Sequence, residues 1–278
     1  MRRQTTEVLP SPYPPVRVSL VRGLAAAARP LPLAMTFLGL LAVWGAYALA
    51  GVPLSPRLLV NILSIPPVQT YFDVALATSV PLGTVPLIAL FGSLMAGRAL
   101  LLAGLGLLLS LALGWEREGS ATRRLLRSAL TMFLVLSVEA AAILAVPLLA
   151  RSLGAGIEVL AFFGILVGGL FILGLVPAIA SIEGDPAASI LRKSARAARL
   201  PSGRHLLLVA GYVSFLLWIS VITPTSQVAP ATPGPLVWAF ALVASFVHVG
   251  FLGALIHRWL AVRDRVGGEP APRPPRRP

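Results

Sequence analysis

The sequence predicts an all-α, polytopic integral membrane protein with six transmembrane helices and a short cytoplasmic amphipathic helix between the fourth and the fifth. Hydrophobic residues make up 57% of the chain and charged residues only 12%, which is far from the composition of soluble domains. Each apolar run has about the 20 residues that a helix needs to cross roughly 30 Å of hydrocarbon. The six runs lie near residues 32–51, 86–114, 127–150, 156–182, 205–223 and 236–262.

The distribution of basic residues predicts the orientation of these spans. All but three of the 23 Lys and Arg residues fall in four segments that a six-span chain places on one side: 1–31, 115–127, 183–204 and the tail after 257. The exceptions are Arg57, Arg98 and Arg151. Cytoplasmic loops retain Lys and Arg, so we expect both termini in the cytoplasm. Lys193 is the sole lysine, a composition that favours a bacterial source and hence the cytoplasmic (inner) membrane.

We divide the chain into an N-terminal arm and interfacial helix (1–31), a six-helix transmembrane domain (32–262) and a disordered tail (263–278). Four prolines interrupt residues 1–16, whereas 16–29 suits a helix lying on the inner headgroups. Trp44 and Tyr47 are expected to anchor the outer end of the first span. The polar leader before this span is too long for a secretory signal, so we expect no cleavage after residues 48–50.

The connector at 52–85 is unusually apolar for an external segment. Prolines divide it into pieces of about ten to thirteen residues, which are too short to cross a bilayer. We expect interfacial or re-entrant helices over Pro56–Ile65 and Val68–Ser79, with a plain packed loop as the alternative. Non-helical backbone at membrane depth would need shielding by protein or water.

The later connectors predict the neighbours of each helix. The turn at 115–121 is short, so the second and third spans should be antiparallel neighbours, as should the third and fourth across 151–155. Asp185 as the N-cap and Pro186 at the first helical position predict a cytoplasmic helix from 186 to 199. Its basic residues are expected to contact lipid phosphates or a partner: Arg192, Lys193, Arg196 and Arg199.

Small residues on the fourth span suggest close helix packing. Gly164 and Gly168, with Gly169 and Gly174, form a face of the GxxxG kind. We expect this face to contact another helix, either within the chain or in a homo-oligomer.

Three ionisable side chains fall at mid-depth: Arg98, Glu139 and His248. Each lies about 18 Å along its helix from the nearer surface, where an unpaired charge is costly. Because the second and third spans form a hairpin, we hypothesise an ion pair between Arg98 and Glu139. This pair either stabilises the bundle or, with His248, lines a polar path for a substrate or proton.

Several classes of activity lack support in the sequence. Cysteine is absent, which excludes disulfides and thiolate chemistry, and no hydrolase, nucleotide-binding or zinc motif occurs. We therefore predict no catalytic residues, no metal and no cofactor. The net charge of +13 is divided among four cytoplasmic segments, which favours anionic headgroups over nucleic acid as the partner.

One segment resembles a known family. The sequence from Val176 to Gly184 (VPAIASIEG) is followed by an Ala-rich helix with the step Arg192-Lys193-Ser194. This pattern resembles the membrane domain attached to some bacterial glycerophosphodiester phosphodiesterases and related six-helix proteins. The resemblance covers about 35 residues, and the catalytic domain has no counterpart here. It implies a membrane domain with a role in lipid or envelope processes.

Two functions from different classes follow. The first is a non-enzymatic membrane protein whose basic helix contacts lipid or a protein partner. The second is a permease or transporter component that uses the mid-membrane residues. A water-accessible cavity reaching Arg98 and Glu139 would favour transport, and a sealed pair would favour a structural role. A lipid-modifying enzyme is a third, weaker alternative because no catalytic set is visible.

Overall fold

The computed structural model describes residues 11–49, 51, 55–79, 84–115, 120–201, 203–223 and 234–267. The described residues form helices and no strands, and six of these helices are long and apolar enough to cross a membrane. The predicted fold class is therefore confirmed. Most of the predicted N-terminal arm, the connector at 224–233 and the tail after 267 lie outside the described residues.

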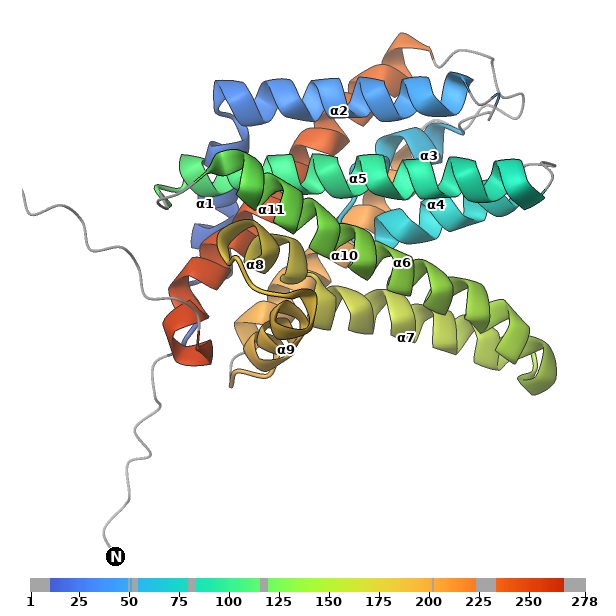
Figure 1. Ribbon diagram of the computed structural model, residues 1–278. Coiled ribbons are helices and arrows are strands. Elements are labelled where there is room, and N and C mark those ends of the chain that lie inside the picture. The colour runs from blue at the N-terminus through green and yellow to red at the C-terminus, as the bar shows by residue number, and fades with distance from the viewer. Residues whose placement is uncertain are drawn as a thin grey trace, which may run out of the picture.

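Six helices correspond to the predicted spans. They are α2 (Pro30–Leu49), α5 (Thr84–Ala112), α6 (Ala121–Leu153), α7 (Ala155–Leu173), α10 (Gly203–Ile222) and α11 (Pro235–Val266). Two of them, α6 and α11, are longer than predicted. In Figure 1, α1 (Val16–Ala27), α9 (Ala187–Ala198) and the C-terminal end of α11 gather at one end of the bundle. We call this the basic end, because it carries the arginine-rich segments.

The fourth span is broken rather than continuous. Helix α7 ends at Leu173, and after Gly174 and Leu175 the chain begins the short helix α8 (Val176–Ile182). Pro177 lies in the first turn of α8, where its missing N–H costs no intrahelical hydrogen bond. All residues of α8 are buried, and α8 packs against α5, α6 and α11. This interruption was not predicted, because hydropathy does not change across it.

Helix α1 lies against α11 instead of resting only on the membrane surface. Gly23 is buried in this contact, where an added Cβ would lie 2.2 Å from the Gly250 carbonyl oxygen and 2.4 Å from the Ala254 nitrogen. The absence of side chains at Gly23 and Gly253 lets the two backbones touch. The arginines of this segment remain exposed on its other faces.

The apolar connector folds into the bundle as a helical hairpin. Helix α3 (Pro56–Val60) and helix α4 (Val68–Ser79) enclose a loop at 61–67, and every residue from Leu59 to Thr70 is buried. The loop contacts α5, α10 and α11 through side chains described below. The hairpin is thus re-entrant, one of the alternatives that the sequence left open.

Candidate functional site

The hairpin loop places backbone groups deep in the bundle, where they need hydrogen-bond partners. Three side chains from other helices supply them. Arg98 of α5 donates from Nη1 to the Ile62 carbonyl, and His248 of α11 contacts the Val60 carbonyl at 3.1 Å. The Tyr212 hydroxyl accepts from the Ile65 N–H at 2.7 Å. The long spans therefore carry the polar groups that hold the loop.

Arg98 forms its ion pair with Asp73 of α4. Its Nη2 lies 2.8 Å from Asp73 Oδ1, and its Nε lies 3.2 Å from Asp73 Oδ2. Tyr47 of α2 also donates to Asp73, so Tyr47 is buried and does not serve as the predicted interfacial anchor. Arg98 and Asp73 are only 2% and 1% exposed. A bidentate contact between a guanidinium and a carboxylate is among the strongest hydrogen-bonded pairs in proteins.

The Gln69 side chain completes the shell around Arg98. In the amide orientation that satisfies its neighbours, Gln69 donates to the Ser64 carbonyl at 3.0 Å. Its oxygen then accepts from Arg98 Nε at 2.9 Å and Nη1 at 3.1 Å. The guanidinium thus links the loop, α4 and α5.

The hypothesised pair between Arg98 and Glu139 is wrong. Helix α4 packs against both α5 and α6, and side chains four residues apart share one face of a helix. Gln69 and Asp73 face Arg98, whereas Thr70, one position further round, contacts Glu139.

Thr70 donates to Glu139 Oε2 at 2.9 Å. The other oxygen, Oε1, has no hydrogen-bond partner among the described residues, and the Glu139 side chain is 4% exposed. Val74, on the same face of α4 as Thr70, packs with Ala140 and Ile143 of α6. Arg98 and Glu139 therefore contact different faces of α4 and do not meet.

His248 belongs to a directional chain of hydrogen bonds. The Val60 carbonyl can only accept, so Nε2 carries the ring hydrogen. Nδ1 then accepts from the Tyr212 hydroxyl at 2.9 Å, and that hydroxyl accepts from the Ile65 N–H. Every hydrogen-bonding atom of His248 and Tyr212 in this chain is used. The geometry therefore fixes the loop and leaves neither side chain available to a ligand.

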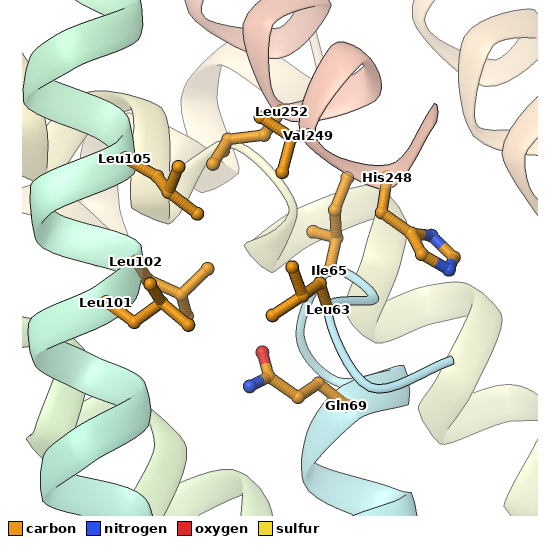
Figure 2. Close-up of a pocket in the computed structure, with 9 residues that line it drawn as sticks. All are labelled: Leu63, Ile65, Gln69, Leu101, Leu102, Leu105, His248, Val249 and Leu252. Atoms are coloured by element: carbon orange, nitrogen blue, oxygen red, sulfur yellow. The ribbon is translucent and has the colours of Figure 1, made fainter. Parts of the chain in front are cut away.

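The space beside this network is closed. Figure 2 shows Leu101, Leu102 and Leu105 of α5 facing the loop and α11 across a gap that also borders Gln69 and His248. The cavity there measures about 10 Å³, which is the space of one water molecule. A space of this size does not hold a solute larger than water.

A larger opening lies between α7 and α10, over the hairpin. We call this cavity, of about 190 Å³, the lateral groove. Phe163 of α7 and Leu217 of α10 are 51% and 58% exposed, so the groove opens at the surface of the bundle. The lining is apolar with a few polar groups: Asn61, Val68, Tyr71, Phe72, Phe163, Leu166, Val167, Leu170, Val213, Leu216, Leu217 and Ser220.

The basic end contains a second buried guanidinium. Arg258 of α11 donates to the carbonyls of Arg204 and Pro14 at 2.8 and 3.0 Å and to Ser19 Oγ at 3.3 Å. It also lies 5.0 Å from the centre of the Tyr13 ring. Burial raises the pKa of the Tyr13 hydroxyl to about 12, although Arg258 acts in the opposite direction. This hydroxyl donates to the Ala197 carbonyl at 2.7 Å, so the N-terminal segment is bound to α9.

The predicted basic set on α9 divides into exposed and paired members. Arg192, Arg196 and Arg199 are exposed. Lys193 instead lies 2.6 Å from Asp185 and 3.3 Å from Glu183. Burial opposes its charge, but these two carboxylates raise the pKa of Lys193. Lys193 is therefore paired within the chain and is not free to contact a lipid phosphate. The N-cap of α9 is Pro186, not Asp185 as predicted.

Within the described residues, the glycine face of α7 contacts no other helix at its first two positions. An added Cβ at Gly164 or Gly168 would meet nothing within 4 Å. Gly169 does approach the hairpin, because a Cβ there would lie 2.8 Å from Pro67 Cγ. The small residue is needed where α7 covers the loop.

The described part of the chain contains no group of three His, Asp or Glu side chains arranged to hold a metal ion. Sequence reasoning missed Asp73, Tyr212 and Asn61. Asp73 had a usable signal, since it is an ionisable residue inside an apolar piece of the connector. Tyr212 and Asn61 had none, because each has a partner far away in the sequence: Ile65 and His248 for Tyr212, and Ser220 for Asn61.

Comparisons with models of protein families, with curated proteins and with solved structures found no match to this chain.

Proposed function

We propose that this chain is a non-enzymatic protein of the bacterial cytoplasmic membrane that binds a membrane lipid in the lateral groove. Both termini would lie in the cytoplasm, as the basic segments predict. The observation that carries the proposal is the apolar groove of about 190 Å³ between α7 and α10, open on the side that faces the bilayer. Its size and lining suit an alkyl chain, since apolar cavities accept apolar ligands.

The remaining expectations are compatible with this role. The likeness of residues 176–194 to the membrane domain of glycerophosphodiester phosphodiesterases supports a role in lipid or envelope processes. The exposed arginines of α9 would contact anionic headgroups or a protein partner on the cytoplasmic side. The outward Gly164 and Gly168 would allow contact with a second copy of the chain.

Native mass spectrometry of the protein released from nanodiscs tests the lipid site. Val213 lines the groove, so Val213→Phe should fill it. Val221 lies on the same helix but outside the groove and is 78% exposed, so Val221→Phe is the control. We expect the parent and Val221→Phe to retain a bound lipid and Val213→Phe to lose it. Equal retention by the two variants would refute the proposal.

A transporter component is the second candidate. It is favoured by one observation, the unpartnered Glu139 Oε1 in the membrane interior. The absence of cysteine allows a direct test, since each introduced cysteine is unique in the chain. A water-soluble maleimide should label Arg192→Cys on exposed α9 and leave Glu139→Cys unlabelled. Rapid labelling at position 139 would support an aqueous path and favour transport.

A further inference from the structure

Resting on the proposed function, we infer that the lateral groove selects a single-chain lipid with a free hydroxyl beside the chain, such as a monoacylglycerol. The hydroxyl would donate to Asn61 Oδ1, and the chain would lie between α7 and α10. Three features support this assignment: an unpartnered acceptor at one end of the groove, an apolar body of limited volume, and a lining without charge.

The acceptor is defined by the hydrogen bonds of the Asn61 amide. Nδ2 donates to the Arg57 carbonyl at 2.9 Å and to Ser220 Oγ at 3.3 Å. A carbonyl can only accept, so the nitrogen must face Arg57, and the position of the oxygen is fixed in turn. Oδ1 has no partner among the described residues, and Asn61 is 1% exposed. A buried acceptor without a donor is costly, and a ligand hydroxyl would satisfy it.

The polar and apolar parts of the groove lie at different depths. Ser220 is close to the end of α10 opposite the basic end, and Val213 lies about 10 Å deeper along the same helix. Leu170 of α7 is buried at the deeper end. A lipid of the leaflet opposite the basic end would therefore place its polar group at Asn61 and its chain toward the bilayer centre.

The volume of the groove favours one chain over two. A cavity of roughly 150 Å³ in another protein holds a single benzene ring, and this groove measures about 190 Å³. By this measure the groove holds a segment of one acyl chain, and the rest of that chain would extend into the bilayer. A lipid with one chain and a neighbouring hydroxyl matches both this volume and the free acceptor.

The lining also argues against recognition of a phosphate. None of the residues that line the groove carries a charge at neutral pH. A phosphate would find no Arg or Lys with which to form charge-assisted hydrogen bonds there. A neutral glycerol hydroxyl needs only an acceptor, and Asn61 provides one.

The test compares two ligands that share one chain. Native mass spectrometry in detergent is used to titrate the protein with 1-monooleoylglycerol and with methyl oleate, which lacks the hydroxyl. We expect monooleoylglycerol to bind about fivefold more tightly, the effect of one net hydrogen bond. Asn61→Ala should reduce this ratio to about one, while Val221→Ala should preserve it, because Val221 is 78% exposed and lies outside the groove. The parent ratio stands even if Asn61→Ala fails to fold.

The outcomes separate this inference from the proposed function. Equal binding of the two ligands by the parent, with both weakened by Val213→Phe, would refute hydroxyl selection and leave the lipid groove intact. Binding that Val213→Phe does not change would refute the groove itself. A ratio that survives Asn61→Ala would place the recognised hydroxyl elsewhere.

Discussion

Three arginines are buried in the described part of this protein, Arg98, Arg258 and Arg263, and the first two are stabilised in different ways. Arg98, in the middle of α5, forms a two-point ion pair with Asp73. Arg258, near the basic end of α11, donates to the backbone carbonyls of Arg204 and Pro14 and to a serine hydroxyl, and it lies over the Tyr13 ring. No carboxylate contacts Arg258 in the described part of the chain.

Depth explains the difference. Arg98 lies about 21 Å from either end of α5, whereas Arg258 lies about 12 Å from the end of α11. At mid-depth a charge without a counter-charge is strongly disfavoured, while near a helix end neutral acceptors and nearby water suffice. The comparison indicates that Arg98 needs the carboxylate that the hairpin supplies, whereas neutral oxygen acceptors suffice for Arg258.

The largest expected effect comes from removing the deep counter-charge. Asp73→Asn leaves Arg98 buried without an anion, and breaking such a pair costs about 3–5 kcal/mol. Unfolding of the detergent-solubilised protein by titration with SDS measures this loss. The double variant Asp73→Asn with Arg98→Gln should recover part of it, because no charge is then left unpaired. Losses that simply add in the double variant would contradict a direct coupling.

A smaller effect is expected at the basic end. Arg258→Met removes hydrogen bonds to two carbonyls and a hydroxyl, at a cost of roughly 1.5–3 kcal/mol, and should release the segment around Tyr13 from α9. The same SDS titration measures stability, and limited proteolysis reports release of residues 13–19. Arg265→Met is the control, because Arg265 is exposed on the same helix. A loss as large as that of Asp73→Asn would undermine the role of depth.

The smallest expected effect concerns the second buried carboxyl group. Glu139 accepts one hydrogen bond from Thr70 and contacts no cation in the described residues. Glu139→Gln keeps an acceptor for Thr70, so we expect its unfolding free energy to change by less than about 1 kcal/mol. The matched acid-to-amide change at Asp73 provides the scale. If the two variants lost stability equally, Glu139 would have to be an anion with a partner.

The sequence predicted the spanning helices well, because a long apolar run has few alternatives to crossing a bilayer. It also identified Arg98, Glu139 and His248 as mid-depth polar residues. It did not predict their partners, because Arg98 and His248 bond backbone carbonyls of the hairpin, which only the tertiary structure places between α5 and α11. The fixed hydrogen on His248 Nε2, for example, depends on a carbonyl 188 residues away.

The candidate lipid site was less predictable than the polar network. Asn61 and Ser220 are separated by 159 residues, and neither stands out in a chain rich in small polar and apolar residues. The groove arises because α7 contacts the hairpin at Gly169 while α10 contacts it at Tyr212. No local pattern encodes the gap that remains between those two contacts.

By itself the amino-acid sequence determined that this protein suits a lipid bilayer, which six helices are able to cross it, and that the arginine-rich segments share one end of the bundle. These properties follow from transfer free energies that add up residue by residue along each run. Only the tertiary structure decided which carboxylate neutralises Arg98, which side chains satisfy the hairpin backbone and where an open groove remains. Those outcomes depend on the rotation of α4 between its neighbours, because a turn of one residue, about 100°, exchanges the partner that each side chain meets.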